Sequence, residues 1–204
     1  MLKETFIALL QPYAAGSRLS TELWEEIARA YSRKGRYYHT LEHLDNLLQQ
    51  LTEVKPHITD WDTLLFTLYY HDIVYNPAKS DNEEKSAGLA TVRMQQLSTP
   101  AGMIERCGRQ ILATKQHGGH PDADTNYFLD ADLSVLGQPW EVYASYYKNI
   151  RKEYAIYPAL IYNPGRRKVL NHFLQMERIF KTAHFFNKFE QQARLNLQKE
   201  STLL

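Results

Sequence analysis

Residues 61–75, WDTLLFTLYYHDIVY, constrain the fold most strongly, because a helix formed by them is apolar on nearly every side. Such a helix has no polar face to turn toward water and is usually central and buried. We predict that Asp60 caps this helix and that it runs to about Ile73. The apolar stretch is too short to cross a bilayer and contains His71 and Asp72, so a buried core helix is expected.

The remaining segments also favour helices, because they show no sustained alternation of apolar and polar residues and no hairpin signal. Ser80 and Glu83 have capping-box spacing at the start of one predicted helix, and Pro164 sits at the first position of another that runs to about Ala183. The predicted fold class is all-α, a compact bundle of about eight to ten helices. We expect a single domain over residues 1–204, with a core at about 36–154 and C-terminal helices at 164–200 packing on it.

Charge and length limit the classes of partner. The 204 residues carry 24 Lys and Arg against 23 Asp and Glu, so a nucleic-acid polymer is not an expected partner. Residues 1–16 lack the continuous apolar core of a signal peptide, and Cys107 is the single cysteine, so a soluble, cytoplasmic protein without membrane partners is expected. The amphipathic C-terminal segment suggests a homodimer.

Three segments carry metal-ligand side chains among apolar neighbours: His39 with His43, His71 with Asp72, and Asp130 with Asp132. Residues four apart on a helix project from one face, which places the first two imidazoles together. A histidine and an aspartate near a core are costly unless they are paired or bind metal. Imidazoles and carboxylates suit Mn, Fe, Co, Ni, Zn or Mg, so these segments predict a divalent metal site.

The same residues carry a family resemblance. A histidine, a later His-Asp pair and a distant aspartate form the pattern of the HD superfamily of metal-dependent phosphohydrolases. The chain resembles the bacterial HD phosphohydrolases through the motifs RYYHTLEHL, YYHDIVYNP, SDNEEKSA, ILATKQH, FLDADLSVLG and IRKEY. This resemblance implies an HD-domain-like helical bundle and one divalent ion per chain, held by His43, His71, Asp72 and Asp132. His39 competes with His43, and Asp130 with Asp132; we prefer His43 and Asp132, with Asp130 as a cap or orienting residue.

Further roles follow from the resemblance. It implies proton transfer by Asp72 itself or by a glutamate at Glu83 or Glu84, whose alternative role is helix capping. Candidate substrate-binding residues are Arg36, His39, Lys115, His117 and Arg151. His117 is alternatively a second-metal ligand or a helix-end residue, and Arg151 alternatively pairs with a carboxylate. Four tyrosines near the metal segments, Tyr37, Tyr38, Tyr70 and Tyr75, either stack a nucleotide base or pack in the core.

Three functions compete. The first is hydrolysis of a small phosphorylated substrate, with a nucleotide preferred, by a metal-activated water. The second is a di-iron oxygenase of the HD fold, which needs extra histidines such as His39 and His117. The third is a metal- and nucleotide-binding sensor without catalysis. We prefer the first of these functions, phosphate hydrolysis.

Overall fold

The structure, a computed structural model, describes residues 1–14 and 18–204. Within these residues it has eleven α-helices, ten of seven residues or more, and no strand, which confirms the all-α prediction. The chain divides into two compact units, Met1–Leu129 and Asp130–Leu204, and the expectation of one domain stays a prediction. Residues 15 and 16 of the N-terminal segment, which we read as lacking a signal peptide, lie outside the described residues.

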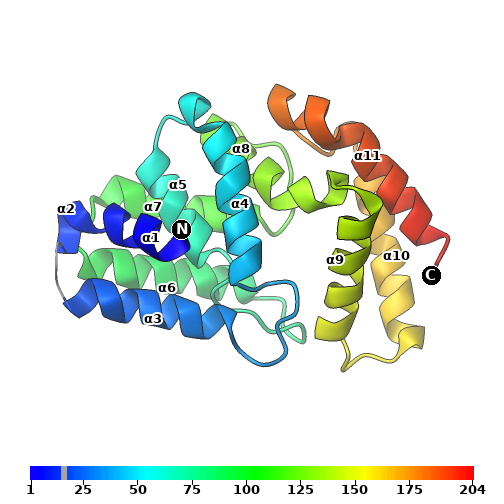
Figure 1. Cartoon of the computed structure of the whole chain (residues 1–204), viewed down its shortest axis with the longest axis horizontal. Coiled ribbons are helices and arrows are strands. Elements are labelled where there is room, and N and C mark those ends of the chain that lie inside the picture. Colours follow the sequence, from blue (N-terminus) through cyan, green and yellow to red (C-terminus); the bar gives the residue numbers. More distant parts are fainter. Residues whose placement is uncertain (15–17) are drawn as a thin grey trace. The chain divides into compact units, whose positions relative to one another are not determined.

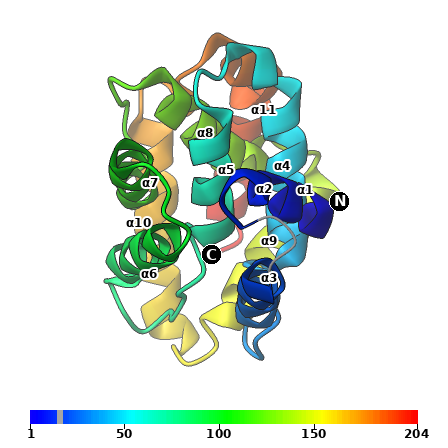
Figure 2. The same ribbon diagram turned by 90° about the vertical axis from the view of Figure 1, so that its left-hand side faces the viewer.

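The first unit is built around one buried helix, α5. The helices of this unit, drawn in Figures 1 and 2, are α1 (Leu2–Leu9), α2 (Gln11–Ala14), α3 (Arg18–Tyr31), α4 (Leu41–Glu53), the short η1 (Lys55–His57), α5 (Trp61–Tyr70), α6 (Asn82–Gln96) and α7 (Ala101–Ala113). Helix α8 (Ala123–Asp132) begins in this unit and ends in the second. Because α1, α4, α6 and α7 all pack against α5, its apolar surface is covered on every side.

The burial of α5 confirms the prediction made from its composition. All eight residues of α5 after Asp62 are buried, and Asp60 caps the helix by accepting the Thr63 N–H at 3.1 Å. Two of its buried hydroxyls are satisfied, since Thr67 donates to Gln110 and Tyr69 to a backbone carbonyl, whereas the buried Tyr70 hydroxyl has no hydrogen-bond partner among the described residues. The helix ends at Tyr70, three residues earlier than predicted, so the His-Asp pair follows its last turn.

The start of α6 differs from the prediction. The capping box of Ser80 and Glu83 is wrong, because Asp81 occupies the N-cap position and makes no side-chain capping hydrogen bond. Contacts with the segment after the His-Asp pair hold this helix end instead: the Val74 N–H donates to the buried Ser86 hydroxyl. A long-range contact therefore replaces the local cap.

An arginine and three carboxylates join α7 to the starts of α5 and α8. The Arg106 guanidinium lies 2.6 Å from Asp122, 3.0 Å from Asp124 and 3.4 Å from Asp60. Partial burial of Asp122 favours its neutral form, but Arg106 and the Thr125 hydroxyl outweigh burial and lower its pKa to about 2. This network ties the middle of α7 to the starts of α5 and α8 in the first unit.

The second unit consists of the short helix η2 (Leu133–Gly137) and the helices α9 (Trp140–Glu153), α10 (Ala159–Gln175) and α11 (Ala183–Ser201), with α11 packed on η2 and α10. Gly137 makes this packing close, because a Cβ atom there would lie 2.4 Å from the Phe189 Cβ. A buried ion pair joins Arg166 of α10 to Glu200 of α11 at 2.7 Å, and the Tyr143 hydroxyl donates to the same carboxylate. The unit therefore has an ionic centre as well as an apolar one.

The predicted bounds of the helix from Pro164 to Ala183 are wrong. Helix α10 begins at Ala159, with Pro158 at its N-cap, and contains Pro164 in its second turn. It stops at Gln175 because the following chain is held by a distant carboxylate: Glu190 of α11 accepts the backbone N–H groups of Ile179 and Phe180.

No helix in the described part of the chain is long and apolar enough to span a membrane.

Candidate metal centre

The first ligand-type residue is buried in the opening turn of α4. His43 is 5% exposed, whereas His39 precedes the helix, which begins at Leu41, so the prediction that both histidines lie on one helix is wrong. The helix starts late because Thr40 is fully extended (φ −116°, ψ 179°). The two histidines therefore do not share a helix face, and they reach the same region from a loop and from a helix.

His71 follows the last turn of α5 with its ring fixed. Its Nδ1 lies 2.9 Å from the Leu68 carbonyl oxygen, which can only accept, so Nδ1 carries the proton. In the neutral ring Nε2 is then the unprotonated nitrogen, and it lies 3.2 Å from the Nε2 of His43. Metal-binding histidines almost always donate their second ring N–H to an oxygen in this way.

Asp72 brings a carboxylate to the imidazoles. Its Oδ2 lies 3.3 Å from His71 Nε2, 3.7 Å from His39 Nε2 and 3.9 Å from His43 Nε2. Its side chain is 20% exposed, against 1% for His71 and 4% for His43. Three imidazoles and one carboxylate thus converge within the first unit, and the carboxylate lies on the more open side of the cluster.

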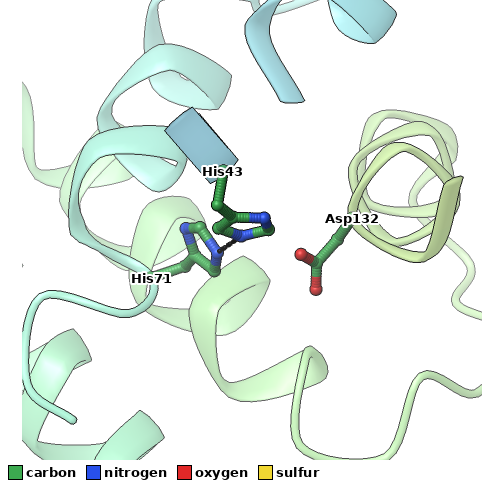
Figure 3. Close-up of side chains that lie close together, drawn as sticks. All are labelled: His43, His71 and Asp132. Atoms are coloured by element: carbon green, nitrogen blue, oxygen red, sulfur yellow. Dashed lines mark hydrogen bonds between the residues drawn. The ribbon is translucent and has the colours of Figure 1, made fainter. Parts of the chain in front are cut away.

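Asp132, the last residue of α8, belongs to the same group. Ligand atoms of His43, His71 and Asp132 all lie within 4.8 Å of one another, and Figure 3 shows the three side chains pointing toward one another. Asp130 does not belong to it. Its two carboxylate oxygens accept hydrogen bonds from the Lys181 N–H at 2.8 Å and the Thr182 N–H at 2.7 Å, at the start of α11.

The donor set fits a divalent ion. Two nitrogens bound to one zinc-like ion at 2.0–2.1 Å lie about 2.9–3.4 Å apart for angles between 90° and the tetrahedral value. The Nε2 atoms of His43 and His71 are 3.2 Å apart, and Asp72 Oδ2 is 3.3 Å from the second of them. Imidazole nitrogens and carboxylate oxygens are ligands for Zn and the other first-row divalent metals, so the buried His43, His71 and Asp132 group can hold such an ion.

The predicted proton-transfer glutamates lie at the first turn of α6. The Glu84 carboxylate is exposed and pairs with the Lys115 ammonium, which also donates to the Ser80 carbonyl at 2.7 Å. The hydrogen bond from Lys115 lowers the pKa of Glu84, which keeps this carboxylate ionised near neutral pH and makes it a poor general acid. Glu83 is half-buried in the same turn.

Two predicted substrate residues have backbone roles. His117 adopts a left-handed conformation (φ 49°) after α7, and its N–H donates to the Ala113 carbonyl, which is how a helix end is commonly closed. Arg151 donates to the carbonyls of Tyr154 and Tyr157 at the end of α9. It binds carbonyl oxygens there, not the carboxylate of our alternative interpretation.

The predicted base-stacking tyrosines differ in exposure. Tyr38 and Tyr75 pack against the imidazoles of the cluster, with Tyr75 4.3 Å from the His39 ring, and Tyr37 is 48% exposed. Tyr70 is fully buried and so has no face for a base. Sequence reasoning missed Tyr31, whose hydroxyl accepts the Asp72 N–H at 3.2 Å; its only signal was its place on the apolar stripe of α3.

Comparison with protein-family models, curated proteins and solved structures found no match to this chain.

Proposed function

We propose that the protein is a metal-dependent phosphohydrolase that acts on a small phosphorylated substrate, with a nucleotide as the preferred class. The observation that carries the proposal is the pair of Nε2 atoms 3.2 Å apart, with the second ring of the pair locked by the Leu68 carbonyl. This arrangement is typical of two histidines that share one ion. The motifs shared with HD phosphohydrolases support the step from metal binding to phosphate chemistry.

When bound, a divalent ion supplies a Lewis acid for a phosphoryl oxygen and lowers the pKa of water. Within the protein, His43, His71 and Asp132 bind the ion, and Asp72 completes the set. We assign the proton transfer to Asp72 in preference to Glu84, because Asp72 Oδ2 faces the imidazoles and Glu84 is held by Lys115 on the surface. His39, 3.7 Å from the same carboxylate, hydrogen-bonds the substrate or the carboxylate.

The test begins with metal binding, because a direct hydrogen bond between His43 and His71 would give the same 3.2 Å spacing. Titration with Mn²⁺, Ni²⁺ and Zn²⁺ is followed by calorimetry, and hydrolysis of a panel of nucleotides and phosphomonoesters is measured with each metal. His71→Ala and Asp72→Ala are compared with His57→Ala, an exposed histidine on η1. We expect the first two variants to lose binding and turnover and the third to keep both.

Full activity in His71→Ala or Asp72→Ala would refute the proposal. Metal binding without turnover of any substrate in the panel would favour the sensor interpretation.

A second candidate, a di-iron oxygenase, is favoured by one observation: His39 brings a third imidazole within 3.7 Å of the Asp72 carboxylate. Counting bound metal in protein purified without chelator separates the two functions. Two irons per chain would support the oxygenase, and one non-redox ion would support the hydrolase.

A further inference from the structure

One arginine joins the two backbone segments that carry the ligand-type residues of the first unit. Arg36 lies between α3 and α4, and its Nη1 donates to the His39 carbonyl at 3.1 Å. Its Nη2 donates to the Ile73 carbonyl at 2.9 Å, immediately after the His-Asp pair. The planar guanidinium therefore fixes the spacing of two loops that are distant in sequence.

Two tyrosines that contact this guanidinium also contact the cluster. The Tyr31 ring centroid lies 4.8 Å and the Tyr75 centroid 5.3 Å from the guanidinium carbon, both within cation–π range. The Tyr31 hydroxyl accepts the Asp72 N–H, and the Tyr75 ring packs on the His39 imidazole at 34°. Each ring that holds the arginine thus also holds a residue of the candidate metal centre.

We infer that Arg36 is a positioning residue that sets the metal affinity of this centre, and that Tyr31 acts with it. The inference rests on the proposed function, because it needs a metal at the cluster. It also changes the expectation that Arg36 binds phosphate, since two of its N–H groups already donate to backbone carbonyls. A lysine keeps the charge but cannot donate to both carbonyls in the fixed geometry of a guanidinium or stack as a plane on a tyrosine ring.

The experiment measures Zn²⁺ and Mn²⁺ affinity of the full chain by calorimetry at one pH, together with thermal unfolding in chelator. Arg36→Lys should weaken binding by about tenfold to a hundredfold, the usual effect of removing a group that orients metal ligands. Tyr31→Phe, which removes one hydroxyl and keeps the ring, should weaken it by about threefold to tenfold.

Arg151 provides a matched control. It donates to the carbonyls of Tyr154 and Tyr157 at 3.0 and 3.1 Å and lies 4.6 Å over the Tyr162 ring, so it makes the same kinds of contact. None of these residues belongs to the metal centre. Arg151→Lys should therefore leave metal affinity unchanged, whatever it does to the unfolding temperature.

The outcomes separate the inference from the proposed function. Wild-type affinity in both Arg36→Lys and Tyr31→Phe would overturn the inference and leave the metal centre intact. A wild-type protein that binds neither metal would overturn the proposed centre and the inference with it. Equal losses of affinity in Arg36→Lys and Arg151→Lys would show a general stability effect and would also overturn the inference.

Discussion

Asp130 and Asp132 lie only two residues apart, but their substitution by asparagine is expected to change different properties. Asp130→Asn should lower the thermal stability, and Asp132→Asn should weaken metal binding. Asp130 is fully buried and accepts hydrogen bonds at 2.7–2.8 Å from the Lys181 N–H, the Thr182 N–H and the Thr182 hydroxyl. An asparagine has one carboxamide oxygen, so one of the two half-buried N–H groups would face an NH₂ group.

The cost follows from these contacts. A buried donor that loses its acceptor costs about 1–3 kcal/mol, and the remaining bonds also lose their charged acceptor, so we expect a loss of about 2–3 kcal/mol. For a chain of this size that corresponds to a fall of roughly 5–10 °C in Tm. Asp132→Asn should act on metal binding instead, because a carboxylate oxygen of Asp132 lies within 4.8 Å of the ligand nitrogens of His43 and His71.

The assay pairs differential scanning calorimetry in chelator with Zn²⁺ or Mn²⁺ titration. Asp130→Asn should lower Tm and keep metal affinity, whereas Asp132→Asn should weaken metal binding by about tenfold or more. The reverse pattern would refute the reasoning, because it would make Asp130 the ligand and Asp132 the structural residue.

Other predictions concern stability. Folding lowers the pKa of Asp122 from 3.8 to about 2, so its ionised carboxylate contributes about 2 kcal/mol to the free energy of unfolding. This contribution is present above pH 4 and is lost as the pH falls to 2. Urea unfolding across this range should show the loss in the wild type and not in Asp122→Asn. Gly137→Ala should cost about 1–3 kcal/mol in the same assay, because the new Cβ would meet Phe189 at 2.4 Å. Glu200→Gln should cost about 3–5 kcal/mol by leaving the buried Arg166 charge without its partner, and Glu200→Leu with Arg166→Met should recover most of that loss in thermal unfolding.

Much of the fold was predictable because it depends on local pattern. The burial of α5 follows from its composition, and Asp60 caps it because an acceptor side chain precedes the helix. Where a distant group decides, the sequence-based prediction was wrong. The break after Gln175 is held by Glu190, fifteen residues later, so no pattern near Pro164 indicates it.

The candidate site divides in the same way. Ligand chemistry indicates which segments can carry a metal, and the structure groups His43, His71 and Asp132, one from each predicted segment. The separate position of Asp130 could not be derived, because its partners are the backbone groups of residues about fifty positions later. The contacts of Arg36 with Tyr31 and Tyr75 could not be derived either, because they depend on a fold that brings residues 31 and 75 together.

The orientation of His71 follows from how α5 ends. In a continuing helix the Leu68 carbonyl would accept the N–H of Asp72, but that N–H donates to the Tyr31 hydroxyl. The carbonyl is one of the unsatisfied groups that every helix end leaves, and the His71 ring satisfies it through Nδ1. The same hydrogen bond therefore closes the helix and turns Nε2 toward His43. Because closing the helix already fixes the ring, a metal at the proposed site would require little further ordering of His71. This explains why the His-Asp pair directly follows a buried helix in the sequence.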